Sequence, residues 1–83
     1  MPLEDKQLRL RVMREIARRN VDSSRLDVEA IGDVVYLRGR LRPLRSQRGK
    51  IDMQKELETI KDNIMRLRGV RDVSDRDLIL LES

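Results

Sequence analysis

An alternation of apolar and polar side chains over residues 34–42 constrains the fold of this chain more than any other feature. Successive side chains of a strand point to opposite faces of a sheet. As a strand, the segment separates into an aliphatic set and a polar set: Val35, Leu37, Gly39 and Leu41, against Tyr36, Arg38, Arg40 and Arg42. The pattern therefore predicts a half-buried strand with a row of three arginines on its outer face.

The basic character continues beyond this strand, since no acidic residue occurs between Asp33 and Asp52. The candidate lipid- or anion-binding residues of this stretch are Arg38, Arg40, Arg42, Arg45, Arg48 and Lys50. Basic residues near an anionic membrane contribute about 1 kcal/mol each, and the same residues attract the phosphates of nucleic acids. In the alternative interpretation the arginines form a solvated face, and Asp27 and Glu29 of a neighbouring strand pair with two of them.

Two segments with different periodicities precede this strand. Residues 4–20 are predicted to form a helix, because apolar residues recur every four positions at Leu8, Val12 and Ile16. After a polar break at residues 20–24, residues 25–31 alternate as a strand. Gly32-Asp33 then lies between two strand patterns, which predicts a hairpin. Gly39 within the strand marks either the close approach of a ligand or a helix that packs closely over the sheet, and the aliphatic neighbours favour the helix.

A basic connection, a second helix and a third strand are predicted after Pro43. The connection covers residues 43–50, and the helix begins between Ser46 and Asp52. Its apolar residues follow helical spacing: Met53, Leu57, Ile60, Ile64 and Leu67. Gly69 is expected as the glycine that ends this helix. The last strand begins at Val70, is interrupted by Asp75-Arg76-Asp77, and ends with residues 78–81.

These elements occur in the order αββαβ. Amphipathic helices and one-faced strands bury their apolar sides against each other. The predicted fold is therefore α+β, a two-layer sandwich with a three-stranded mixed sheet and two helices packed on one face. A length of 83 residues gives a single domain, 1–83, with its core at about residues 5–81.

Composition excludes several kinds of site. The chain has no cysteine and no histidine, so it lacks the side chains of disulfides, thiolate zinc sites and the usual general base. The acidic cluster of Asp72, Asp75 and Asp77 lacks the glycine and the terminal glutamate of an EF-hand loop. We therefore expect no catalytic residue, metal site, cofactor or small-molecule substrate, and we do not expect an enzyme.

Targeting signals are also missing from the sequence. No run of residues approaches the roughly 18 apolar residues of a membrane span. The N-terminal residues lack the apolar stretch of a signal peptide. A cytoplasmic location is expected if Met1 is the natural start, and an envelope location if the chain was excised from a longer precursor.

The order of elements and several motifs resemble the BON domain, a small bacterial αββαβ module. The motifs are the first-helix stripe, Leu26-Asp-Val28, the hairpin from Gly32 to Leu41, and Gly69-Val70-Arg-Asp-Val73. The resemblance spans residues 5–81. It implies a non-catalytic protein of the bacterial periplasm or outer membrane that binds phospholipid surfaces or helps attach proteins to the envelope. It also implies structural roles for Gly32, Gly39, Gly69 and Val70.

The leading functional hypothesis is attachment to anionic phospholipid surfaces or envelope components through the basic face. A second hypothesis is a protein-interaction or homodimerisation module that uses the long second helix. In that case an extended helix would leave Ile51 and Met53 overhanging the sheet. A third is weak, sequence-independent binding of nucleic acid. It is disfavoured because single-strand binders stack bases on aromatic side chains, and Tyr36 is the one aromatic residue.

Overall fold

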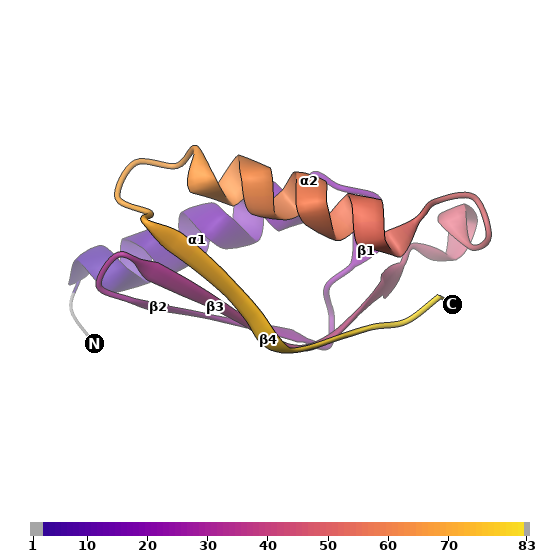
Figure 1. Cartoon of the computed structure of the whole chain (residues 1–83), viewed down its shortest axis with the longest axis horizontal. Helices are drawn as coiled ribbons and strands as arrows, with labels where there is room; N and C mark the ends of the chain where they lie inside the picture. Colours follow the sequence, from indigo (N-terminus) through magenta and orange to yellow (C-terminus); the bar gives the residue numbers. More distant parts are fainter. Residues whose placement is uncertain (1–2, 83) are drawn as a thin grey trace.

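Two helices lie on the same side of a β-sheet in the computed structural model, which describes residues 3–82 (Figure 1). The elements in chain order are α1 (Leu3–Ala17), β1 (Val21–Asp22), β2 (Leu26–Ile31), β3 (Val34–Pro43), the 3-10 helix η1 (Arg45–Gln47), α2 (Met53–Met65) and β4 (Asp72–Leu80). The predicted α+β class is confirmed. The sheet has four strands, whereas the sequence predicts three.

β3 is the central strand of the sheet. β2 pairs with it in antiparallel orientation, from Leu26 opposite Gly39 to Ile31 opposite Val34, as the predicted hairpin requires. β4 pairs with its other side in parallel orientation, and there Val34 lies opposite Asp72. The long connection through α2 permits this parallel arrangement, because parallel neighbours need a crossover.

The additional strand is β1, which pairs with the end of β3 in antiparallel orientation. The amides of Arg40 and Leu44 donate to the carbonyls of Arg25 and Asn20 at 3.1 and 3.2 Å. Arg40 and Leu44 are four residues apart, and the backbone groups of every second residue in a strand point to the same side. β1 and β2 therefore lie one after the other along the same edge of β3. A strand of two residues has no detectable periodicity, which is why the sequence predicts only a polar break there.

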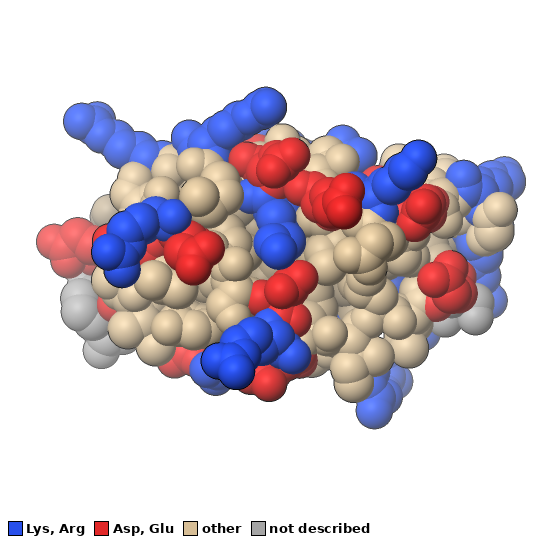
Figure 2. Space-filling model, viewed as in Figure 1, with Lys and Arg blue, Asp and Glu red and all other residues tan. Residues whose placement is uncertain are grey.

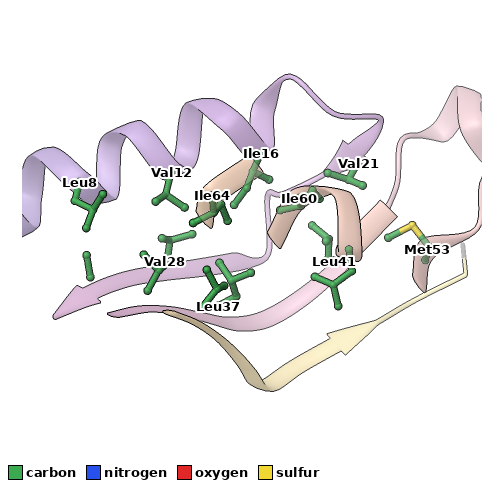
Figure 3. Close-up of a cluster of buried hydrophobic side chains, with 14 residues drawn as sticks. Leu8, Val12, Ile16, Val21, Val28, Leu37, Leu41, Met53, Ile60 and Ile64 are labelled. Carbon is green, nitrogen blue, oxygen red and sulfur yellow. The ribbon is translucent and has the colours of Figure 1, made fainter. Parts of the chain in front are cut away.

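The hydrophobic core lies between the helices and the sheet (Figure 3). Both α-helices and all four strands contribute to one cluster, whose largest fully buried members are Ile16, Leu37, Leu41, Met53, Ile60, Ile64, Val12 and Val35. The polar set of β3, from Tyr36 to Arg42, is only partly buried or exposed. The predicted alternation of residues 34–42 is therefore confirmed.

α2 begins directly after Asp52, which is its N-cap residue. The Asp52 carboxylate accepts hydrogen bonds from the amides of Gln54 and Lys55 at 3.0 and 3.4 Å, which is the usual role of an N-cap aspartate. The connection before it contains η1 and does not extend α2. The overhang of Ile51 and Met53 that an extended helix would produce does not occur, because Met53 is 1% exposed and Ile51 packs against the core.

Two further expectations about the C-terminal half are wrong. α2 ends at Met65 with Arg66 as its cap, so Gly69 lies in the following turn and does not end the helix. β4 runs unbroken through Asp75-Arg76-Asp77. Its register shifts where Tyr36 and Arg38 lie opposite Ser74 and Asp77. One extra residue of β4 is therefore accommodated as a bulge, and the polar segment does not end the strand.

Gly39 is required for a different reason from the one that its position in the sequence suggests. Its φ angle is 96°, a conformation that is costly for residues with a side chain. A Cβ atom there would also collide with the carbonyl oxygen of Arg25, next to β2. The close neighbour is thus the backbone of the adjacent chain segment and not a helix.

Candidate anion-binding surface

The six cations predicted as one surface belong to two different elements. Arg38, Arg40 and Arg42 lie on β3, and their neighbours Leu37 and Leu41 point toward the helices. This arginine row therefore occupies the open face of the sheet. Arg45, Arg48 and Lys50 lie in and just after η1. We call these three residues the basic loop. Figure 2 shows basic side chains at the right-hand end of the molecule, the end where the ribbon in Figure 1 contains η1.

Arg38 is matched by a carboxylate on the neighbouring strand. Its Nη1 donates to Glu29 Oε2 at 3.0 Å, and its guanidinium lies 5.5 Å from the centroid of the Tyr36 ring. The pairing predicted in the alternative interpretation is therefore confirmed for Glu29. Both side chains remain solvent-accessible, so the pair adds little stability. It does place a negative charge beside this arginine.

Arg42 is matched by Asp22 of β1. Its Nε donates to Asp22 Oδ2 at 2.9 Å, and the Ser24 amide donates to Oδ1 of the same carboxylate at 2.9 Å. Hydrogen bonds from Ser24, and then from Arg42, lower the pKa of Asp22 to about 2. Asp22 is therefore ionised at neutral pH. The alternative interpretation named Asp27 as the second acidic partner of an arginine. The observed partner is Asp22, which lies on β1, a strand that the sequence pattern does not predict.

Arg40 differs from its two neighbours, because no ion pair of Arg40 is recorded within residues 3–82. It lies opposite Ile79 of β4. Two residues earlier on β4, Asp77 lies opposite Arg38. The open face of the sheet thus alternates in charge across its strands, and the arginine row is not a uniformly cationic surface.

The basic loop has a different environment. All three of its cations are exposed, and none forms an ion pair with the rest of the described chain. Backbone hydrogen bonds from Gln47 N to Leu44 O at 2.8 Å and from Lys50 N to Gln47 O at 3.0 Å shape the turn. Leu44, at the start of the turn, is 39% exposed. The loop therefore presents unpaired cations next to an exposed aliphatic side chain.

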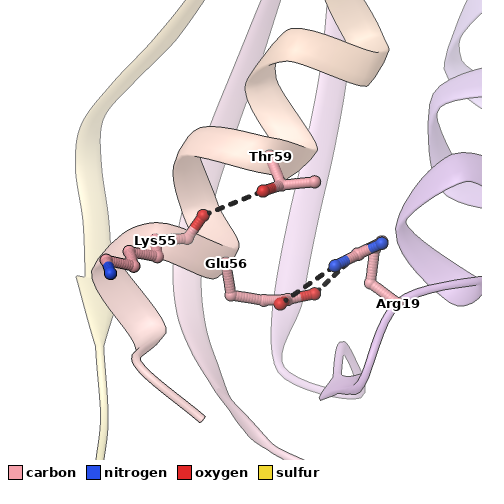
Figure 4. A network of polar contacts seen from close by, with 4 residues as sticks. All are labelled: Arg19, Lys55, Glu56 and Thr59. Atoms are coloured by element: carbon pink, nitrogen blue, oxygen red, sulfur yellow. Dashed lines mark hydrogen bonds and ion pairs between the residues drawn. The ribbon is translucent and has the colours of Figure 1, made fainter.

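The most buried charged pair of the described chain was not predicted from the sequence. Arg19, beyond the end of α1, donates from Nε and Nη2 to the Glu56 carboxylate of α2 at 2.7 and 3.2 Å (Figure 4). Glu56 is 7% exposed, and its hydrogen bond raises the pKa of Arg19 above the ordinary value. The sequence did contain a signal for this buried acid. Glu56 lies three residues after Met53 and four before Ile60, so helical spacing places it on the apolar face of α2. This pair links the segment after α1 to α2, and its carboxylate is buried.

Other kinds of site find no support in the described residues. Within residues 3–82, no group of three or more acidic side chains is arranged to hold a metal ion. Neither α-helix in that range is long and apolar enough to cross a membrane. The three glycines expected to be structural, Gly32, Gly39 and Gly69, all have positive φ angles. They shape the backbone and contribute no side chain to the surface.

Comparisons of the chain with protein-family models, with curated proteins and with solved structures find no match in any of the three. The resemblance to the BON domain consequently depends on the motifs of the sequence and stays a prediction.

Proposed function

We propose that this protein is a non-catalytic binding module that attaches to anionic phospholipid surfaces, and that the basic loop makes the contact. The observation that carries the proposal is the difference in pairing between the two groups of cations. Arg38 and Arg42 already have carboxylate partners, whereas the basic loop has none within the described residues. Unpaired, exposed cations are the ones that a lipid phosphate can engage without competing with an internal partner.

The expected strength of this contact follows from the number of free cations. Each basic residue at an anionic membrane surface contributes about 1 kcal/mol, so three contribute about 3 kcal/mol. This corresponds to roughly a hundredfold increase in partitioning over a neutral membrane. The interaction is electrostatic between exposed groups and weakens as salt rises.

The position of Leu44 supports a membrane as the binding surface. Interfacial binding combines cations that meet lipid headgroups with apolar side chains that enter the boundary of the acyl layer. Leu44 is exposed immediately before η1, beside the three cations. A soluble anion would use the charge of this turn but not the leucine.

The alternatives have less support. Most exposed positions of α2 are polar, namely Gln54, Lys55, Glu58 and Asp62, which is unlike the apolar centre of a dimer interface. For nucleic acid, the ring of Tyr36 is already covered by the guanidinium of Arg38. A base-stacking platform on the sheet is therefore disfavoured.

Co-sedimentation with vesicles tests the proposal. The protein is mixed with vesicles of phosphatidylcholine alone, and with vesicles that also contain phosphatidylserine. We expect binding to the second kind only, with loss of binding in the triple variant Arg45→Gln/Arg48→Gln/Lys50→Gln. Equal and negligible binding to both kinds of vesicle would reject the proposal.

A charge-matched variant serves as the control. Arg66, Arg68 and Arg76 are exposed and form no ion pair with described residues. The variant Arg66→Gln/Arg68→Gln/Arg76→Gln has the same net charge as the basic-loop variant and should retain most of the binding. If the two variants lose binding equally, net charge is responsible and the basic loop is not the site.

A further inference from the structure

The two outer edges of the sheet differ in how they are protected. The edge of β2 is covered, because Val28 and Ala30 are 5% and 1% exposed and the Val28 carbonyl accepts a hydrogen bond from Arg9 Nε at 2.8 Å. The opposite edge is β4, which lies at the front of the sheet in Figure 1 and pairs only with β3 within residues 3–82. Charged side chains and bulges commonly protect such edges from pairing. In β4 both occur before residue 78, so the last part of the strand lacks them.

Residues 78–81, Leu-Ile-Leu-Leu, have backbone groups that point out from the sheet. The Leu81 amide donates to the Leu41 carbonyl of β3 at 2.9 Å. Because the backbone groups of successive strand residues point to opposite edges, those of Leu78 and Leu80 point away from β3. No hydrogen bond recorded in the described part of the chain occupies them on that side. Both residues are also partly exposed, unlike those of the β2 edge.

We propose that β4 of a second copy of this chain pairs with this edge in antiparallel orientation, so that the two sheets join across a twofold axis at Ile79. Leu78 of each copy then exchanges backbone hydrogen bonds with Leu80 of the other. Ile79 is 54% exposed and lies opposite Arg40 on the open face of the sheet. The two Ile79 side chains form a non-hydrogen-bonded pair, the arrangement in which facing side chains come closest.

Charge favours this partner and this register. Arg76 and Glu82 are exposed, and neither forms an ion pair with described residues. Ile79 lies three positions after Arg76 and three before Glu82, so Arg76 of each copy faces Glu82 of the other. Opposite charges on facing strands are stabilising. Moving the register by two residues in either direction places a leucine opposite one of these charges and loses the pair.

Such an association ends at two copies. A twofold interface uses the same patch on both molecules, so pairing uses up both β4 edges, and the outer strands of the joined sheet are the covered β2 strands. A contact of a few residues per strand buries less than the roughly 1,200 Å² of a standard interface, so we expect a weak dimer. The interface contains no residue of the basic loop and does not depend on lipid binding.

Sedimentation and nuclear magnetic resonance between about 10 µM and 1 mM protein test the inference. We expect a monomer–dimer equilibrium, with hydrogen exchange at the amides of Leu78 and Leu80 slowing as the concentration rises. Ile79→Glu should weaken the dimer at least about tenfold, because it places two carboxylates face to face. The matched control is Ile31→Glu, since Ile31 is also 54% exposed but lies on β2; it should dimerise like the wild type. A monomer throughout this range, or equal weakening by both variants, overturns the inference.

Exchange of the paired charges tests the register. Arg76→Glu alone and Glu82→Arg alone should each weaken the dimer about tenfold, because each places like charges opposite one another. The double variant Arg76→Glu/Glu82→Arg should recover the wild-type affinity. An equimolar mixture of the two single variants should form a heterodimer for the same reason. Absence of recovery in both samples overturns the proposed pairing.

Discussion

The arginine row of β3 and the basic loop show how two groups of similar cations, a few residues apart, acquire different properties. The arginine row lies in a sheet, where strand pairing fixes the neighbours of each side chain. Glu29 and Asp22 are held beside Arg38 and Arg42 in this way. The basic loop lies beyond the sheet edges and has only its own backbone to shape it. Availability of a cation for a ligand is thus decided by the strands around it.

The largest expected difference between the two regions concerns their glycines. Gly39→Ala should destabilise the protein by about 3 to 5 kcal/mol, because it combines a strained φ angle with a clash against a backbone carbonyl. Gly49→Ala, between Arg48 and Lys50 of the basic loop, should cost about 1 kcal/mol, since only the φ angle is unfavourable there. Chemical denaturation followed by circular dichroism measures both values. Equal losses would show that the loop is as constrained as the strand.

A second prediction concerns the most tightly paired charge, Glu56. Glu56→Ala should lower the free energy of unfolding by about 2 kcal/mol, because it leaves the partly buried Arg19 guanidinium without its partner. Glu15→Ala breaks the pair with Arg18, which is 74% exposed, and should cost less than about 0.5 kcal/mol. The same denaturation experiment applies. A loss for Glu15→Ala as large as that for Glu56→Ala would contradict the role given to burial.

The Asp22–Arg42 pair predicts a dependence on pH. The pKa of Asp22 is about 2 in the folded protein, below the ordinary value of 3.8. A carboxyl group with a depressed pKa stabilises the fold above its unfolded pKa, and that stabilisation is lost as pH falls through the folded pKa. The melting temperature of Asp22→Asn should therefore lie below that of the wild type near neutral pH, and the difference should shrink between pH 4 and about 2. A constant difference would argue against an ionised Asp22.

The smallest effect is expected for the basic loop itself. Arg45→Gln/Arg48→Gln/Lys50→Gln should change stability by less than about 0.5 kcal/mol, since exposed side chains without partners contribute little. Arg38→Gln/Arg42→Gln should cost about 1 kcal/mol, because two ion pairs are lost. Thermal melts of both variants check this order. A basic-loop variant less stable than the arginine-row variant would indicate internal contacts that the structure does not contain.

Much of the fold follows from periodicity alone. The stripes of α1 and α2 and the alternation of β2 and β3 predict which side chains are buried, because a layered fold has to cover each apolar face. The errors fall where local patterns are short or polar. β1 has two residues, and the aspartates within β4 resemble a turn although a bulge keeps them in the strand.

The candidate site was less predictable, because its properties depend on contacts between distant residues. Glu29 is nine residues from Arg38, and the hairpin register places Asp27 directly opposite this arginine with Glu29 diagonal to it. Asp22 is twenty residues from Arg42 and Glu56 is thirty-seven from Arg19, and neither spacing has a local signature.

The sequence by itself determined the aliphatic face of residues 34–42, the two amphipathic helices and the gap in acidic residues around the basic loop. These are local properties, set by side-chain chemistry and the geometry of each element. The tertiary structure decided which arginines are matched by carboxylates and which glycine faces a backbone carbonyl. Those properties arise only when segments far apart in the chain are brought into register, because short-range contacts between charges, backbone groups and apolar surfaces depend on distance in space.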